Sequence, residues 1–262
     1  MTKVASIQFQ IKDEESKEQR FARVSALIDK ARGADLILLP EMWNIGFLSF
    51  DNYESWGEAV NGPTADFLAQ RAKDVGAYIL GGSIVEKNGG KMYNTALFFG
   101  PDGDMMATYR KIHLVTRAGA AEARLLTGGS SPTVVDCDFG KVGISICYDI
   151  RFPELFRTMA VDMGAEAFLH VASWPLQRTE NWMDMMHVRA NENQAWLVSC
   201  GMCGSNGGVQ NFGHSGIVDP NGISVAGSGL EETIVTGEID LEYVREFRKG
   251  TPHFNSIKLW KK

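Results

Sequence analysis

Three residues with chemically active side chains each lie where a predicted strand ends. Glu41 follows the apolar run 36–39, Lys111 follows a predicted strand at 105–110, and Cys147 ends another apolar stretch. A carboxylate among apolar neighbours can act as a base, a lysine can stabilise an oxyanion, and a thiol can act as a nucleophile. Each residue also has an ordinary alternative: a solvated glutamate, a surface lysine or a buried structural cysteine.

Cys147 stands at a predicted turn from a strand into a helix. The helix begins near Pro153, and proline suits the first turn of a helix. Backbone N–H groups at a helix start favour the thiolate over the thiol. We therefore expect this turn to expose the Cys147 thiol and to favour its ionised form.

The elements around these residues alternate between strands and helices before giving way to hairpins. Mixed strands with helices between them indicate sheets covered by helices, and two such sheets could stack face to face in one domain spanning residues 1–262. A loop is predicted at 113–131 and another at 201–213. The predicted helices are at 15–31, 62–75, 181–193 and from residue 152 onward. The predicted strands are at 3–8, 36–39, 78–85, 93–99, 105–110, 133–138, 142–147, 167–172, 196–200, 215–218, 223–226 and 233–239.

Composition narrows the classes of partner. The chain has 262 residues, of which 44% are hydrophobic, and a net charge of −6. It lacks the basic footprint that neutralises nucleic-acid phosphates or binds anionic lipid, so a small-molecule partner is favoured. We expect no signal peptide and no membrane-spanning segment. The four scattered cysteines do not suggest a disulfide framework, so a cytoplasmic protein with reduced thiols is expected.

Three segments in order carry a resemblance to a known family. They are LPEMWNIGF at 39–47, YRKIHL at 109–114 and GISICYDIRFPEL at 143–155. Together they resemble the nitrilase superfamily of carbon-nitrogen hydrolases, and the resemblance extends from Val4 to about Leu259. It implies a four-layer α-β-β-α sandwich of two stacked mixed sheets that commonly forms homodimers or larger homo-oligomers.

The resemblance also implies a role for each catalytic residue. Glu41 matches the general base, Lys111 the oxyanion stabiliser and Cys147 the nucleophile. Glu122 fits the second glutamate that the family has between the lysine and the cysteine. The backbone N–H of Tyr148 would be the second oxyanion donor. These roles imply a cysteine-dependent amidase that makes a carboxylic acid and ammonia through a thioester.

Several segments look most like the omega-amidase branch, which hydrolyses the terminal amide of 2-oxoglutaramate or 2-oxosuccinamate. Such substrates carry a distant carboxylate that Arg151 could bind bidentately, with Arg117 and Arg178 as further candidates. The alternative for Arg151 is a salt bridge to an acid of its own turn. Trp174 is predicted to line the pocket, or else to pack in the core. The segments are 171–175, 189–193, 213–215 and 254–259, together with position 178.

Other activities stay open at this point. An N-carbamoyl hydrolase, a short aliphatic amidase and a true nitrilase belong to the same class of enzyme, and a ligand-binding homologue without turnover is a more distant alternative. The C-x-x-C spacing of Cys200 and Cys203 could instead indicate a redox pair. The five histidines are far apart and the nucleotide-binding glycine motifs are absent, so we expect no metal and no cofactor.

Overall fold

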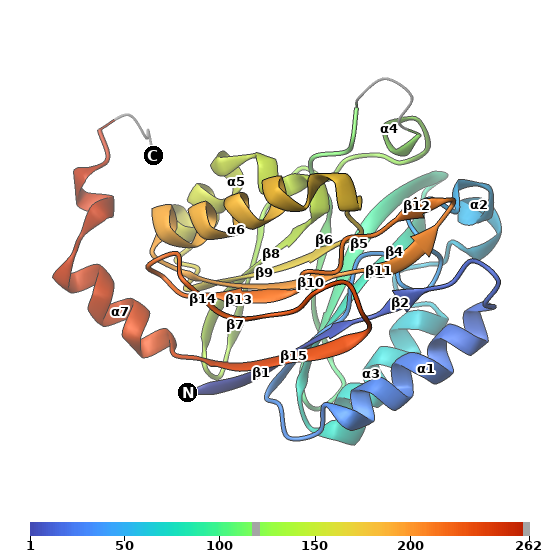
Figure 1. Cartoon of the computed structure of the whole chain (residues 1–262), viewed down its shortest axis with the longest axis horizontal. Helices are drawn as coiled ribbons and strands as arrows, with labels where there is room; N and C mark the ends of the chain where they lie inside the picture. The colour runs from blue at the N-terminus through green and yellow to red at the C-terminus, as the bar shows by residue number, and fades with distance from the viewer. Residues whose placement is uncertain (117–120, 259–262) are drawn as a thin grey trace.

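Two six-stranded mixed sheets form the centre of the protein. The computed structural model describes residues 1–116 and 121–258 (Figure 1). The strand order is β15-β1-β3-β4-β5-β6 in the first sheet and β14-β13-β10-β9-β8-β7 in the second. The first sheet comprises β1 (Thr2–Gln8), β3 (Leu36–Leu38), β4 (Tyr78–Asn88), β5 (Lys91–Phe99), β6 (Met105–Arg110) and β15 (Thr233–Ile239). The second comprises β7 (Thr133–Cys137), β8 (Gly140–Ile146), β9 (Ala167–Ala172), β10 (Trp196–Gly201), β13 (Gly216–Val218) and β14 (Ser224–Gly227).

The two sheets share one plan of strand directions. In the first sheet β1, β3 and β4 run parallel, and β15 and β5 flank them antiparallel. In the second sheet β8, β9 and β10 run parallel, and β7 and β13 flank them antiparallel. Parallel strands end at the same edge of a sheet, so residues that follow them in sequence are brought together there.

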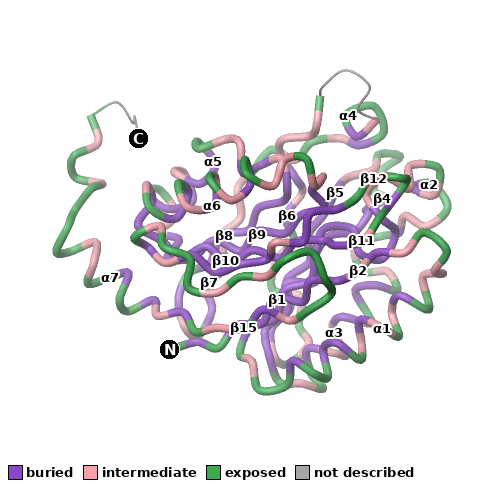
Figure 2. Tube along the Cα trace, viewed as in Figure 1, coloured by how far each residue is buried: buried purple, intermediate pink, exposed green. Residues whose placement is uncertain are grey.

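Helices cover the outer face of each sheet, which gives four layers in the order α-β-β-α (Figure 1). Helices α1 (Lys17–Lys30) and α3 (Pro63–Val75) lie on the first sheet, and α5 (Pro153–Arg157) and α6 (Thr179–Asn193) lie on the second. The strand β3 shows why this order is stable. Leu36 and Leu38 pack into the apolar core between the sheets, and Ile37 packs into a second core beneath α1 and α3. The central strands are therefore buried on both faces (Figure 2), and the predicted fold class is confirmed.

Several elements of the structure were not predicted from the sequence. The predicted loop 201–213 contains two short strands, β11 (Cys203–Asn206) and β12 (Val209–Gln210), and β11 pairs with β2 (Gln10–Ile11). Strands of two to four residues are too short to show a period in the sequence. An unpredicted helix, α7 (Leu241–Gly250), begins at the N-cap residue Asp240, directly after β15 of the first sheet (Figure 1).

The remaining helices are short. Helix α2 (Tyr53–Trp56) follows the loop after β3, and α4 (Glu122–Leu125) is a single turn within the predicted loop 113–131. In the two described stretches of chain, no helix has both the length and the apolar character needed to cross a bilayer.

One buried polar pair lies inside the second sheet. His170 of β9 and Ser145 of β8 contact each other at 2.8 Å between Nδ1 and Oγ, and both side chains are fully buried. The His170 ring lies against Phe156 and Trp182. Burial disfavours the protonated ring and lowers the pKa of His170 to about 3.

The low pKa of His170 predicts a loss of stability in mild acid. The unfolded state binds a proton near pH 6.5, but the folded state does not until about pH 3. The contribution of His170 to the free energy of unfolding is therefore constant well above pH 6.5, and it falls as the pH drops below this value. We expect this residue to lower the free energy of unfolding by about 2 kcal/mol between pH 7.5 and pH 5. Urea titrations of the wild type and His170→Gln at both pH values measure the difference, and an equal pH response in the two proteins would contradict it.

Candidate active site

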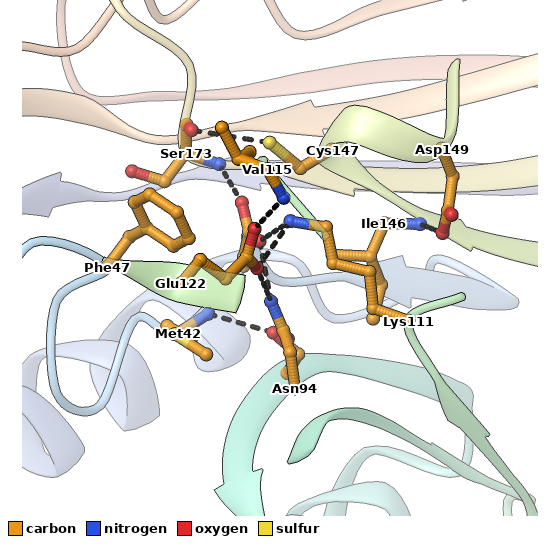
Figure 3. Close-up of polar contacts among 12 residues, drawn as sticks. Met42, Phe47, Asn94, Lys111, Val115, Glu122, Ile146, Cys147, Asp149 and Ser173 are labelled. Carbon is orange, nitrogen blue, oxygen red and sulfur yellow. Dashed lines mark hydrogen bonds and ion pairs between the residues drawn. The ribbon is translucent and has the colours of Figure 1, made fainter. Parts of the chain in front are cut away.

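The ends of four strands meet at one edge of the stacked sheets. β6 runs in the same direction as β3, because β5 lies antiparallel to both β4 and β6 and β4 is parallel to β3. Glu41 and Lys111, which follow β3 and β6, therefore lie at the same edge. Cys147 and Ser173 follow the parallel strands β8 and β9 of the second sheet. Figure 3 shows Lys111, Cys147 and Ser173 converging on the space between the sheets.

Glu41 is fully buried and has a hydrogen-bond donor on each oxygen. Its Oε1 accepts from Asn94 Nδ2 at 2.7 Å and from Lys111 Nζ at 3.1 Å, and its Oε2 accepts from the Ser173 N–H at 2.8 Å. Strand β4 passes close to Pro40, the residue before Glu41, and this close approach requires a glycine at position 82. A Cβ there would lie 2.0 Å from the Pro40 carbonyl oxygen, and the φ of Gly82 is +66°. The local backbone thus fixes the carboxylate of Glu41.

Lys111 lies between two carboxylates. Its Nζ donates to Glu41 Oε1 and, at 2.7 Å, to Glu122 Oε1. The other oxygen of Glu122 accepts from the Val115 N–H at 2.7 Å, so the loop after Lys111 returns to hold this carboxylate (Figure 3). The Phe47 ring centroid lies 5.3 Å from the ammonium. All three charged side chains are buried, and the cluster carries two negative charges against one positive charge when ionised.

Cys147 occupies a strained position at the start of a short 3₁₀ helix, η2 (Cys147–Arg151). Its φ is +48°, a left-handed conformation that is rare outside glycine. The Sγ atom lies 3.6 Å from the Ser173 carbonyl oxygen (Figure 3). Because the N–H of Ser173 binds Glu41 and its C=O contacts the thiol, a single residue lies against both side chains.

The exposure and the ionisation of Cys147 both differ from the expectation, since the turn buries this residue to 4% exposure. Burial raises the pKa of this thiol well above its usual value, the charge of Glu41 raises it further, and Lys111 only partly opposes these effects. The expected thiolate is therefore not favoured in this structure, because burial outweighs the start of the helix. Burial also raises the pKa of Glu41, against the opposing effect of Lys111. Burial alone would lower the pKa of Lys111, but Glu122 and Glu41 raise it well above its usual value.

Asp149 connects the segment around Lys111 to the turn at Cys147. Its buried carboxylate accepts from the Ile146 N–H at 3.0 Å, the Tyr109 hydroxyl at 2.7 Å and the His113 N–H at 3.0 Å. Ile146 directly precedes Cys147, while Tyr109 and His113 lie two residues on either side of Lys111. One carboxylate thus fixes the backbone of both catalytic candidates.

The other predicted site residues have mixed positions. The Arg151 guanidinium lies 5.0 Å from the Trp174 ring centroid and 5.7 Å from that of Tyr148. No ion pair joins Arg151 to an acid of its own turn, and its Nε is buried without a hydrogen-bond partner among residues 1–116 and 121–258. Trp174 is buried and donates through Nε1 to the Arg178 carbonyl. Arg117 lies outside the described residues.

Two groups in the cluster were not predicted from the sequence. Asn94 donates to Glu41, and Ser173 contributes its backbone rather than its side chain to the site. Asn94 had only a weak signal, because it is one of two polar residues, with Thr95, in the predicted strand 93–99. No side-chain pattern could have identified Ser173.

The thiols outside the cluster and the histidines do not form a second centre. Cys200 and Cys203 are free and buried, and their sulfur atoms contact the backbone carbonyls of Ile7, Leu38 and Gln8. Burial raises the pKa of Cys203 to about 12. Across 1–116 and 121–258, no group of three His, Cys, Asp or Glu side chains is placed to hold a metal ion.

Comparison with known proteins gives concordant matches. A sequence model described as carbon-nitrogen hydrolase matches residues 3–249. A 2-oxoglutaramate amidase from Paenarthrobacter nicotinovorans is 34% identical over 262 residues, covering 96% of this chain and 88% of that protein. An omega-amidase from Xenopus laevis is 35% identical over 245 residues, covering 90% and 88%. A 2-oxoglutaramate amidase from Bacillus subtilis is 33% identical over 256 residues, covering 97% of each chain.

Solved structures share the fold. A nitrilase-superfamily protein of Saccharomyces cerevisiae superimposes with a TM-score of 0.87 at 30% identity, covering 96% of this chain and 94% of that one. A carbon-nitrogen hydrolase superfamily protein of Xanthomonas campestris gives a TM-score of 0.91 at 24% identity, covering 100% and 98%.

Proposed function

The chain belongs to the carbon-nitrogen hydrolase family, and from this premise we propose that it is an omega-amidase-like enzyme that uses Cys147 as its nucleophile. The observation that carries the proposal is the buried cluster in which the thiol lies beside Glu41 and Lys111. The amidases of Paenarthrobacter nicotinovorans and Xenopus laevis, at 34% and 35% identity, support the choice of substrate class.

The proposed reaction begins with proton transfer from Cys147 to Glu41. The raised pKa values of both groups suit this step, since the resting thiol is neutral and the buried carboxylate is a stronger base than usual. Sulfur then attacks the amide carbonyl, and the oxyanion accepts hydrogen bonds from Lys111 and the Tyr148 N–H. Glu41 returns the proton to the amide nitrogen, the C–N bond breaks and ammonia leaves a thioester on Cys147.

Hydrolysis of the thioester uses the same carboxylate. Glu41 removes a proton from water, the hydroxide attacks the thioester, and the acid leaves as the thiol regains its proton. Glu122 orients Lys111 through the 2.7 Å contact between their side chains, and it is placed to orient the amide nitrogen. Water is scarce at this position because the whole cluster is buried, which strengthens each of these electrostatic contacts.

We further propose that Arg151 binds the remote carboxylate of the substrate. Its Nε lacks a partner within the described chain, and its guanidinium lies against Trp174, which directly follows the Ser173 that contacts Cys147 and Glu41. A planar guanidinium with free N–H groups matches a carboxylate in charge and geometry. Arg117 and Arg178 stay predictions, and the carbonyl oxygen of Arg178 accepts from Trp174 Nε1.

Removal of the Arg151 guanidinium should weaken recognition of oxo-acid amides specifically. We expect Arg151→Met to lower kcat/KM for 2-oxoglutaramate by about 10- to 100-fold, since a hydrogen bond to a charged group contributes about 1.5–3 kcal/mol. Turnover of a short neutral amide should change little, because that substrate has no carboxylate to lose. Ammonia release from both substrates measures the ratio.

Arg178→Met is the matched control for this experiment. It removes the guanidinium of a second candidate, and because we propose that Arg151 binds the carboxylate, its substrate ratio should stay near that of the wild type. A loss confined to Arg178→Met would move the carboxylate site to that residue. An equal loss for both substrates in Arg151→Met would assign that residue a structural role.

A substrate panel tests the proposed function as a whole. It compares ammonia release from 2-oxoglutaramate, 2-oxosuccinamate, glutamine, a short aliphatic amide, a carbamoyl amino acid and a nitrile. We expect the two oxo-acid amides to give the highest kcat/KM. Preference for another member would keep the chemistry and replace the substrate, and no turnover of any member would favour a ligand-binding homologue.

We also propose that the protein assembles as a homodimer or larger homo-oligomer in the cytoplasm. The assembly is supported by exposed apolar side chains at Val188 of α6, at Ile223 just before β14 and at Val225 within β14. The contact between His187 and Ser224 holds these two elements side by side.

A further inference from the structure

Asn94 is a buried amide within the charged cluster. It lies on β5 and is 1% exposed, and its backbone carbonyl accepts from the Lys111 N–H at 2.8 Å. Its side-chain Nδ2 donates to Glu41 Oε1 at 2.7 Å and lies 3.4 Å from Glu122 Oε1 (Figure 3). Asn94 is therefore in contact with both carboxylates that flank the ammonium.

The orientation of this amide follows from its neighbours. Ionised carboxylates only accept hydrogen bonds, so the NH₂ group of Asn94 must face them. The other end of the amide, Oδ1, is then buried without a hydrogen-bond partner in the described part of the chain. A buried acceptor without a partner is energetically unfavourable. The fold therefore tolerates an unpaired Oδ1 at Asn94, and the Nδ2 group of the same amide donates to the carboxylates.

A neutral donor is the one type of side chain that suits this position electrostatically. Glu41 faces the charges of Lys111 and Glu122, the thiol of Cys147 and the hydroxyl of Tyr53. An aspartate in place of Asn94 would add a third acceptor beside two carboxylates. A second cation would compete with Lys111 for both carboxylates. An amide N–H stabilises negative charge on Glu41 without altering the net charge of the cluster.

We propose that Asn94 is a positioning residue that holds Glu41 and Glu122 together on the Lys111 ammonium and binds the Glu41 carboxylate beside the thiol. This inference rests on the proposed function, in which Glu41 is the base. Asn94 does not contact the thiol; it acts through Glu41, whose second oxygen stays bound to the Ser173 N–H.

The role predicts a shift in the pH profile as well as a loss of rate. The Asn94 hydrogen bond lowers the pKa of Glu41 against the effect of burial, so its removal raises that pKa. Ionised Glu41 is then available only at higher pH, and the acid limb of kcat/KM moves upward. We expect Asn94→Ala to lower kcat/KM at pH 7 by about 10- to 100-fold. Asn94→Asp should lose more.

The experiment measures kcat/KM for the preferred amide from pH 5 to pH 9 in the wild type and in the Asn94 variants. If Asn94→Ala does not fold, Asn94→Ser serves as a second, smaller polar variant. The same upward shift of the acid limb of kcat/KM is expected for it. Thr95→Val is the matched control, since Thr95 is the next residue of β5 and binds Glu86, outside the cluster. Its profile should match that of the wild type.

The outcomes separate this inference from the proposed function. An upward shift of the acid limb in folded Asn94 variants supports the positioning role. A loss of rate with an unshifted limb would reduce Asn94 to a packing residue and overturn the inference while the amidase function stands. If the wild type lacks turnover that depends on Cys147, the proposed function fails and the inference fails with it.

Discussion

Replacement of Cys147 by alanine is expected to abolish ammonia release from every amide that the protein hydrolyses. The thioester cannot form without sulfur, and the remaining groups can only polarise the carbonyl. We expect kcat to fall by a factor on the order of 10⁴ or more, as is typical when a nucleophile is removed. The substitution should leave the fold intact. Alanine is smaller than cysteine, and the left-handed backbone conformation at position 147 is unfavourable for both residues, so the exchange adds no new strain. Ammonia release and circular dichroism measure the two effects.

Cys203→Ala is the matched control for that experiment. Cys203 is also free and buried. Its sulfur contacts the carbonyl of Gln8, which is not part of the charged cluster. Its activity should equal that of the wild type. Activity that survived in Cys147→Ala but not in Cys203→Ala would support the thiol redox alternative and reject the covalent mechanism.

Replacement of Lys111 by methionine should affect both activity and stability. Methionine has a similar length, but it leaves Glu41 and Glu122 buried without their shared cation. Breaking a buried ion pair costs about 3–5 kcal/mol, and losing an oxyanion donor lowers kcat by about 10²- to 10³-fold. Denaturant unfolding and ammonia release test the two effects on one protein.

A second substitution separates these two roles of Lys111. In Lys111→Met with Glu122→Gln, one uncompensated carboxylate becomes neutral, so part of the lost stability should return while activity stays low. The single variant should also recover stability as the pH falls, because burial raises the pKa of Glu41, and without Lys111 this carboxylate takes up a proton more readily in the folded state. A Lys111→Met protein as stable as the wild type at pH 8 would show that the cluster does not need its cation.

The sequence predicted the residues that stand at strand ends better than the contacts between strands. Glu41, Lys111 and Cys147 could be placed because each comes at the end of a predicted strand, and residues after strands of one direction share an edge. Their roles came from the resemblance to the family. Asn94 lies within a strand and meets Glu41 only because β5 pairs beside β4. That contact spans 53 positions in the sequence, and no local pattern encodes it.

Ionisation and short elements were the harder properties to predict. The helix start after Cys147 favoured a thiolate in a local argument, but burial is set by the whole fold and has the larger effect on the pKa of this thiol. Strands β11 and β12 have too few residues for a periodic pattern. Helix α7 shows an amphipathic pattern, with Leu241 and Val244 buried three residues apart. This helix was nevertheless not predicted from the sequence.

The enclosure of Cys147 also affects how the protein would withstand oxidative stress. Its side chain belongs to a residue that is only 4% exposed, and its pKa is raised, so little thiolate is present for peroxide or disulfide reagents to attack. If Cys147 is the nucleophile that we propose, this burial protects the thiol from competing electrophiles of the cell until substrate binds.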